Sequence, residues 1–196
     1  MLVQVVVIFA AVIGVCGATL QPQIPSVASF APSSGSESFQ LSDGILIVVD
    51  SEVVTKGSPS LLNFAKTFRD DLSSVADFKL VPPVQTGSQS SILTKLLPSI
   101  FFTIDTTKNY KLYNGKSTEE GYDLITAHNS ITITATAPIG AWWASRTLLQ
   151  QVALAIKSGS RRISLPLGHI TDSPGWEVRG FMLDAGRHWF ETDFLS

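Results

Sequence analysis

The sequence has very little cysteine, few charged residues and no marked excess of charge of either sign. Cys16 is the only cysteine in 196 residues, and 14 Lys and Arg residues face 16 Asp and Glu residues. A net charge of -2 provides no basic surface for nucleic acid. A single cysteine forms neither an intrachain disulfide nor a Cys-ligated zinc site. We therefore expect no nucleic-acid partner and no bound metal.

Several motifs of common enzyme classes are also missing. The sequence has no Walker loop, no Gly-rich dinucleotide fingerprint, no His-Glu-x-x-His and no Gly-x-Ser-x-Gly. We therefore expect no cofactor. The length and the composition, with 44% hydrophobic and 15% charged residues, are those of an ordinary globular protein of one or two domains.

The N-terminus is an uncharged apolar run from Met1 to Ala18. This run predicts a secretory signal peptide that is cleaved after Ala18, where small residues lie at the usual positions. The alternative is a membrane span, since the run is about the minimum length for crossing a ~30 Å hydrocarbon core. The polar tract Gln21–Gln23 that follows favours cleavage. We expect a secreted protein with no stable membrane anchor, with a lysosome or vacuole as the other location.

Residues 19–43 are rich in Pro, Ser and Gly and contain few large apolar residues. This composition predicts a flexible leader or a loop that lies over the surface. No internal repeat is visible.

Short apolar runs predict a sheet between residues 44 and 172. The run Gly44–Asp50 has the continuous apolar pattern of a strand buried on both faces. Alternation of apolar residues with Thr over 131–136 indicates a strand with one buried face. Further strands are predicted at Lys79–Val81, Ile100–Ile104, Tyr122–Ile125 and Arg161–Leu165, with turns at Asn114-Gly115 and His128–Ser130.

Two segments have the periodicity of helices. The first is predicted to begin with Ser58 as N-cap and Pro59 at the first helical position. Its apolar stripe comprises Leu61, Phe64, Ala65, Phe68 and Leu72. The second runs from Pro138 to about Lys157, and the spacing of Trp142 and Trp143 predicts that both lie in the core. This mixture of strands and helices predicts an α+β domain over residues 44–172, followed by a boundary turn at Asp172–Gly175.

The stretch from Trp176 to Leu195 carries the most chemistry. The apolar run around Arg179 predicts a buried strand that ends at Asp184. An arginine beside such a strand should be paired or functional. Its guanidinium could bind sugar hydroxyls or a carboxylate, or it could form a structural ion pair with Asp184, Glu177 or a neighbour.

The other candidates also have two interpretations. Asp184 lies at a strand end, where barrels and open sheets carry active-site groups, but it could instead cap the next turn. His188 could be a base or a hydrogen-bonded structural residue. Trp176 and Trp189 flank the predicted strand and are candidates for stacking on sugars. His128 and His169 are expected to be structural.

Residues Arg179–Phe190 resemble the opening segment of the catalytic barrel in β-N-acetylhexosaminidases of glycoside hydrolase family 20. The family pattern is Arg-Gly, three apolar residues, Asp, two variable residues, and then Arg-His with two aromatic residues; this sequence matches it throughout. Upstream stretches resemble the family's small N-terminal domain: Gly121–Leu124, Ile131–Ala135, Ala137–Ala141 and Thr147–Gln150. The resemblance covers residues 40 to 196.

The resemblance implies both a fold and an activity. The fold would be an α+β N-terminal domain, a zincin-like sheet with two helices, followed by the start of a (β/α)₈ barrel. The activity would be that of a secreted exo-β-N-acetylhexosaminidase, which removes terminal non-reducing GlcNAc or GalNAc by a substrate-assisted retaining mechanism. Arg179 would bind hydroxyls of the non-reducing sugar, and Asp184 and His188 would support the pocket.

The resemblance also implies that the catalytic machinery is incomplete in these residues. The family's acid, a Glu preceded by an Asp, is expected beyond Ser196, so no catalytic residue is assigned within the chain. A (β/α)₈ barrel needs about 200 residues or more, and residues 173–196 would be only its beginning. We expect a fragment that is inactive alone, with an N-acetylhexosamine oligosaccharide or glycoconjugate as the partner of its parent. A homodimer is left open, and the alternative function is a non-catalytic secreted interaction or carbohydrate-binding module.

Overall fold

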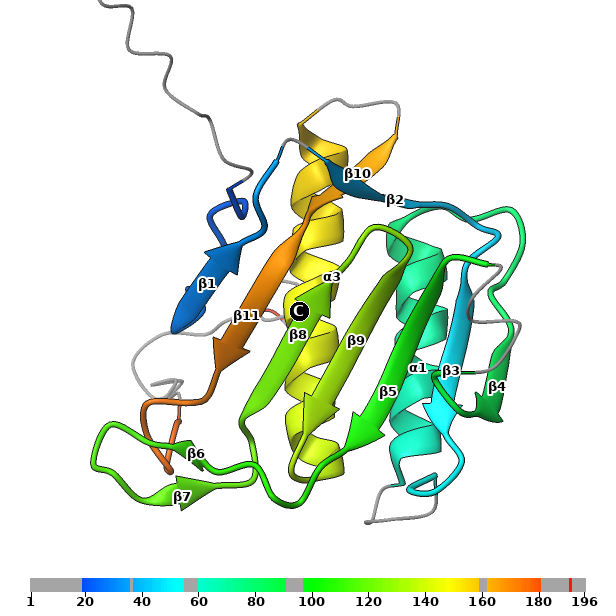
Figure 1. Ribbon diagram of the computed structural model, residues 1–196. Coiled ribbons are helices and arrows are strands. Elements are labelled where there is room, and N and C mark those ends of the chain that lie inside the picture. Colours follow the sequence, from blue (N-terminus) through cyan, green and yellow to red (C-terminus); the bar gives the residue numbers. More distant parts are fainter. Residues whose placement is uncertain are drawn as a thin grey trace, which may run out of the picture.

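The most apolar stretches of the sequence form the middle of one mixed sheet. The computed structural model describes residues 19–35, 37–54, 60–90, 97–158, 162–180 and 191. Its 7-stranded sheet has the order β1-β11-β8-β9-β5-β3-β4 (Figure 1). In that order the strands are Ser29–Pro32, Gly168–Asp172, Tyr122–Thr126, Ser130–Ala135, Ser99–Ile104, Leu46–Asp50 and Val84–Gly87.

The sheet is parallel on one side and antiparallel on the other. The strands β4, β3, β5 and β9 run parallel to one another, whereas β8, β11 and β1 continue the sheet in antiparallel pairs. Parallel neighbours need a crossover, which α1 (Leu61–Val75) provides between β3 and β4. The antiparallel pair β8 and β9 is joined by a short turn in which Ala127 N–H donates to the Ser130 carbonyl at 2.8 Å. This confirms the predicted hairpin.

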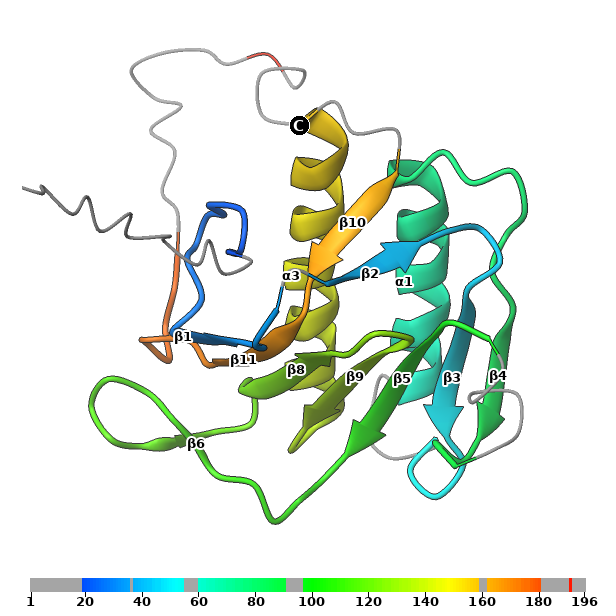
Figure 2. The same cartoon turned by 45° about the horizontal axis from the view of Figure 1, so that its top comes forward.

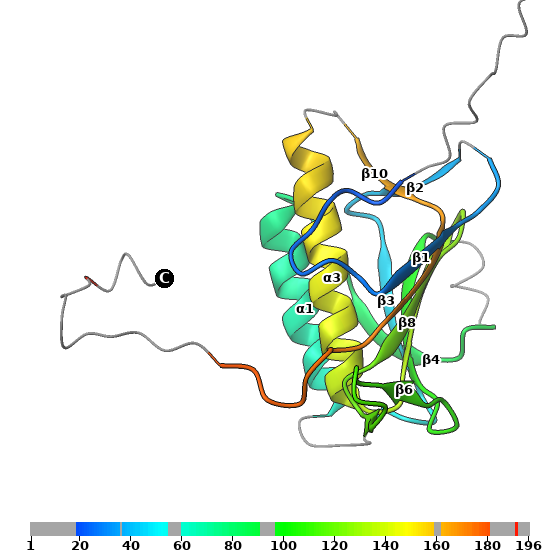
Figure 3. The same cartoon turned by 90° about the vertical axis from the view of Figure 1, so that its left-hand side faces the viewer.

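The two described helices cover the same face of the sheet (Figure 3). The second helix, α3 (Pro138–Lys157), begins at its predicted proline and ends where the sequence indicated. In α1 the structure places the N-cap at Ser60, whose hydroxyl accepts from Asn63 N–H at 3.4 Å. The predicted cap at Ser58 is therefore displaced, and Ser58 and Pro59 lie outside the described residues.

The core lies between the helices and the sheet. Four residues of the predicted α1 stripe are fully buried, and Phe68 packs edge-on against Phe102 of β5 with ring centroids 5.5 Å apart. The small residues Ala141 and Ala144 bring α3 close to the strands. A fully buried phenylalanine pair contributes several kcal/mol through burial alone.

The prediction that Trp142 and Trp143 lie in the core is wrong. Trp142 is half-buried and packs against Phe64, with ring centroids 5.1 Å apart, while Trp143 is 38% exposed. The helix buries its small residues instead, because they allow close approach to the sheet. The tryptophans therefore lie at the margin of the helix layer.

The flexible leader predicted over residues 19–43 is also corrected by the structure. It contains β1, which pairs with β11 at the edge of the main sheet, and β2 (Ser38–Leu41), which pairs with β10 (Ile163–Pro166). Phe39 is fully buried, and the β2–β10 ribbon lies across one end of the helix and sheet layers (Figure 2). The leader is ordered because its partners, which lie more than 120 residues away, supply the backbone hydrogen bonds.

The strand predicted at Lys79–Val81 does not form. Leu80 and Val81 are 67% and 61% exposed, and the edge strand β4 begins only after Pro82 and Pro83. Proline has no N–H for a sheet ladder, so the pairing starts downstream of both. The Pro83 carbonyl accepts from Ile47 N–H at 3.0 Å and thereby begins the parallel β3–β4 ladder.

A second hairpin extends from the edge of the domain. It consists of β6 (Tyr110–Lys111) and β7 (Ser117–Thr118), and its loop contains the predicted Asn114-Gly115 turn. Gly115 adopts a φ of 82°, a left-handed conformation that favours glycine. Lys116 N–H donates to Asn114 Oδ1 at 3.0 Å, which closes the turn.

Candidate functional site

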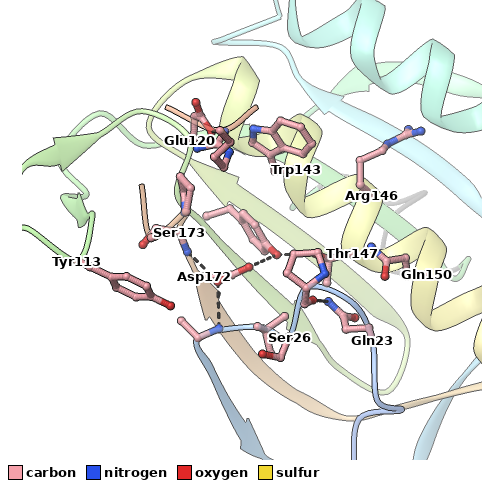
Figure 4. Close-up of a pocket in the computed structure, with 17 residues that line it drawn as sticks. Gln23, Ser26, Tyr113, Glu120, Trp143, Arg146, Thr147, Gln150, Asp172 and Ser173 are labelled. Carbon is pink, nitrogen blue, oxygen red and sulfur yellow. Dashed lines mark hydrogen bonds and ion pairs between the residues drawn. The ribbon is translucent and has the colours of Figure 1, made fainter. Parts of the chain in front are cut away.

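A pocket of about 510 Å³ lies between α3, the segment before β1 and the residues that follow β11 (Figure 4). Trp143, Thr147 and Gln150 line it from α3, whereas Gln23 and Ser26 line it from the N-terminal segment. Its remaining walls come from Tyr113, Glu120, Tyr122, Asp172, Ser173 and Arg179, among others. The lining thus combines three aromatic side chains with several polar ones.

Asp172 anchors the floor of this pocket. Its Oδ1 accepts from the backbone N–H groups of Ala28 and Ser173 at 3.0 and 2.9 Å. Its Oδ2 accepts from the Tyr122 hydroxyl at 2.9 Å, and that hydroxyl also lies 2.6 Å from Thr147 Oγ1 (Figure 4). Burial, together with the charge of Asp172, raises the pKa of Tyr122 above its usual range. Tyr122 is therefore a neutral hydrogen-bond donor here and not a base.

Arg179 lies at the other end of the pocket. Its Nη2 donates to Glu120 Oε2, and its Nη1 donates to the Trp176 carbonyl at 2.6 Å. The guanidinium carbon is 6.0 Å from the centroid of the Trp143 ring. Within the described residues the ion-pair partner of Arg179 is Glu120. Glu177 lies near Lys116 instead, and Asp184 lies outside the described residues. Val178 is 88% exposed and lies in no strand, because the described residues give it no neighbouring strand.

The two carboxylates of the pocket are not arranged for acid–base catalysis. Both of its carboxylates, Asp172 and Glu120, already accept hydrogen bonds from protein donors. The pocket residue Arg146 extends from α3 (Figure 4), and its Nη1 donates to Asp71 Oδ2 of α1 at 2.6 Å. A general acid needs a proton donor that is free to reach the leaving group. Neither carboxylate in the described lining meets this requirement.

A second polar cluster, centred on Asp123, lies on the sheet face opposite the helices. Asp123 is 5% exposed, and its carboxylate contacts four side chains, two from β11 and two from the stretch Lys108–Tyr110. The distances are 2.6 Å from Thr171 Oγ1 and 3.0 Å from each of Lys108 Nζ, Tyr110 Oη and His169 Nε2. The cluster connects β8 to β11 and to the β6–β7 hairpin. His169 is structural here, as expected.

The donors determine the ionisation of this carboxyl group. Burial alone would raise the pKa of Asp123, but the hydrogen bond from Thr171 and those from the other donors outweigh burial and lower that pKa below its usual value. The contact between Lys108 and Asp123 also raises the pKa of Lys108, first through the hydrogen bond and then through the charge of Asp123. The cluster is therefore a buried anion with charged and neutral donors.

Sequence reasoning did not single out Asp123 as a site residue. A usable signal was present, because His169 and Thr171 are two residues apart and must point to one face of a strand. The partners come from positions up to 48 residues away, however, and only the pairing of β8 with β11 brings them together.

Several predicted site residues lie outside the part of the chain that the structure describes. These are Asp184, His188 and Trp189. The predicted signal peptide, Met1–Ala18, also lies outside that part. Trp176 is described and is 61% exposed, with its ring edge-on to Tyr113 at 6.0 Å. Within the described residues no group of three His, Cys, Asp or Glu side chains could hold a metal ion, and no described helix is long and apolar enough to span a membrane.

The α+β architecture and the sequence now identify the family. The model of glycosyl hydrolase family 20, domain 2, matches residues 21–173, and the chain belongs to this family. The match begins within the predicted leader, which agrees with the ordered β1 and β2. It confirms the resemblance stated from the sequence and the α+β fold class.

Known relatives place this domain within longer proteins. A curated β-hexosaminidase from Porphyromonas gingivalis is 29% identical over 164 residues, which are 82% of this chain and 18% of that protein. The family 20 β-N-acetylhexosaminidase of Streptomyces coelicolor A3(2) superposes with a TM-score of 0.58 at 23% identity, covering 86% of this chain and 30% of that one.

An exo-β-N-acetylglucosaminidase of Vibrio harveyi, solved in complex with N-acetylglucosamine, gives a TM-score of 0.57 at 24% identity. The match covers 90% of this chain and 22% of that one. The chain thus spans less than a third of the length of each of these three proteins.

Proposed function

We propose that this chain is the non-catalytic α+β domain of a secreted exo-β-N-acetylhexosaminidase, joined to the beginning of its catalytic barrel. The parent enzyme removes terminal non-reducing GlcNAc or GalNAc from oligosaccharides or glycoconjugates. The observation that carries this proposal is the match to family 20 domain 2 over residues 21–173, followed directly by the barrel-like motif Arg179–Phe190. Either part alone would be weaker support, because a fold by itself does not define a function.

The proposal assigns the chemistry to residues outside this chain. In the substrate-assisted mechanism the acetamido oxygen of the sugar attacks the anomeric carbon while a Glu protonates the leaving oxygen. An Asp beside this Glu orients the acetamido group. Arg179 contributes by donating hydrogen bonds to sugar hydroxyls, for which its planar fork is suited. The two carboxylates of the described pocket already accept hydrogen bonds from protein groups, which supports this division between scaffold and catalytic domain.

We expect the 196-residue chain, purified alone, not to hydrolyse a chromogenic N-acetylglucosaminide above the buffer rate, because the acid and its partner are absent. The measurement is release of the chromophore, with binding of GlcNAc oligomers followed in parallel by calorimetry. Turnover that is lost in an Arg179→Ala variant would contradict the proposal. Binding without turnover would instead favour the alternative of a non-catalytic carbohydrate-binding module.

Export is proposed from the uncharged run Met1–Ala18, which resembles a signal peptide. We expect exported protein to begin at Thr19. N-terminal sequencing of secreted material tests this expectation, and recovery of an intact Met1 on exported protein would rule out cleavage.

A further inference from the structure

Residues 173–180, here called the exit segment, follow the last strand of the sheet without secondary structure of their own. Every second residue of this segment nevertheless contacts the β6–β7 hairpin or Glu120, which follows the hairpin. Ser173 Oγ donates to the Lys111 carbonyl at 2.7 Å, and the Gly175 carbonyl accepts from Tyr113 N–H at 3.0 Å. The segment therefore lies along the hairpin in an extended, strand-like manner.

The contact at Gly175 is possible only because this residue lacks a side chain. A Cβ at position 175 would overlap the Tyr113 ring. That ring also packs edge-on against Trp176, at 85° and 6.0 Å. An alanine at 175 would therefore displace Tyr113 and disrupt its packing on Trp176.

Two ion pairs continue the contact toward the end of the segment. Lys116 Nζ lies 3.4 Å from Glu177 Oε2, with both side chains largely exposed. Arg179 pairs with Glu120, and this pair is better shielded, with exposures of 43% and 27%. An exposed pair contributes little, whereas a partly shielded pair contributes more.

The hairpin is itself fixed to the sheet. Tyr110 and Lys108 both contact the buried Asp123, and Leu112 is 5% exposed. The start of the exit segment is fixed as well, because Asp172 accepts hydrogen bonds from Ala28 N–H, just before β1, and from the Tyr122 hydroxyl. The segment is thus attached at both ends to the rigid part of the domain.

We propose that the β6–β7 hairpin and Glu120 hold the exit segment in one conformation and so fix the direction in which the polypeptide continues beyond Gly180. Tyr113, Gly175 and Glu120 are then positioning residues for Arg179 and for whatever follows it. A catalytic domain attached here would be oriented by the α+β domain and not tethered by a free linker. The contacts themselves do not depend on the proposed glycosidase activity, so their test can fail separately.

Trypsin provides the first test, because it cleaves after Arg179 only when the residues before the bond can leave the hairpin. We expect Glu120→Gln, combined with Gly175→Ala, to increase the cleavage rate at this bond about tenfold, since two local contacts are lost and the segment opens more often. Intact mass spectrometry of timed digests identifies the bond that is cut. Glu120→Gln alone should show a smaller increase in the same direction.

The matched control is Glu119→Gln combined with Gly44→Ala. It makes the same chemical changes next to the contact and at an exposed glycine, where a Cβ would meet only Ser42 Oγ at 3.9 Å. It should leave the cleavage rate unchanged. Equal rates in the control and in both test variants would overturn the proposal. Early cleavage within α1, at Lys66 or Arg69, would reveal global unfolding of the double variant. In that case the cleavage rate of the single variant Glu120→Gln, at a half-buried surface position, decides the test.

A distance measurement tests the fixed direction itself. Spin labels at Gln85→Cys on β4 and Gly180→Cys, in a Cys16→Ser background, report the position of the segment end relative to the sheet. We expect one narrow distance distribution, which Glu120→Gln with Gly175→Ala broadens and Glu119→Gln with Gly44→Ala does not. A distribution that is already broad before the test substitutions would show that the segment is not held.

Discussion

Replacing Asp123 by alanine should lower the free energy of unfolding by about 2–4 kcal/mol, because hydrogen bonds to a charged group contribute about 1.5–3 kcal/mol each and are not additive. The Tyr110 hydroxyl loses its carboxylate acceptor while it remains buried. Lys108 and His169 are each 45% exposed, so water compensates much of their loss. Urea unfolding at pH 7, monitored by tryptophan fluorescence, gives the change.

Asp70→Ala is a suitable control for this substitution. Asp70 also forms an ion pair, with Arg69 at 2.7 Å, but its side chain is 61% exposed. Exposed pairs contribute about 0–1 kcal/mol, so this variant should unfold close to the parent. If both variants showed the same small decrease in the free energy of unfolding, the burial of Asp123 would not determine its contribution to stability.

The same carboxyl group should appear in the pH dependence of stability. The folded pKa of Asp123 is lowered, so its contribution is fully present above the unfolded value of about 3.9 and is lost as pH falls through the folded pKa. The pKa of Lys108 is raised, so its contribution is present below about 10.4 and is lost as pH rises through its folded pKa. We expect a plateau between these limits. Asp123→Asn should decline less steeply than the parent below pH 4, and identical acid slopes would contradict this assignment.

Local sequence patterns were sufficient for the elements that stabilise themselves locally or through nearby partners. The helix from Pro138 to Lys157, the strand at Ser99–Ile104 and the β8–β9 hairpin were all predicted within a residue or two. In each, the periodicity, a proline or a turn lies within the element itself. The polar turn at Asn114-Gly115 was identified for the same reason.

Three strands of the structure, β1, β2 and β11, were not predicted from the sequence. The strands β1 and β2 have no strong apolar pattern, and they form only because β11 and β10 return beside them. Gly168–Asp172 was not predicted as a strand, although it lies second in the sheet. The strand β10 has an equally distant partner in β2, but it was predicted at Arg161–Leu165 from its own apolar residues.

In the candidate site, too, the residue with a local motif was found from the sequence and its distant partners were not. The sequence identified Arg179, because its motif is local and specific. It gave no indication of Glu120, which lies 59 residues away and meets Arg179 only through the extended course of the exit segment. The contact of Gly175 with Tyr113 was hidden for the same reason, since nothing in either residue's neighbourhood predicts the other.

In the full-length hexosaminidase that we propose, Arg179→Ala should reduce kcat/KM by about 10²–10⁴-fold. This range follows if the guanidinium donates to two sugar hydroxyls and each charge-assisted bond contributes about 1.5–3 kcal/mol. Arg179→Lys should recover little of the loss, because an ammonium cannot reproduce the planar fork. The measurement is steady-state hydrolysis of a chromogenic N-acetylglucosaminide by the polypeptide that includes the barrel.

Two further readouts separate substrate binding from a structural ion pair with Glu120. Arg179 is 43% exposed in its side chain, so either substitution should change the thermal unfolding midpoint far less than it changes activity. Glu120→Gln breaks the same ion pair but keeps the guanidinium group itself, so it should retain more activity than Arg179→Ala. If all three variants unfold early and the folded fraction keeps normal kcat/KM, Arg179 is a structural residue and its assignment to the sugar is wrong.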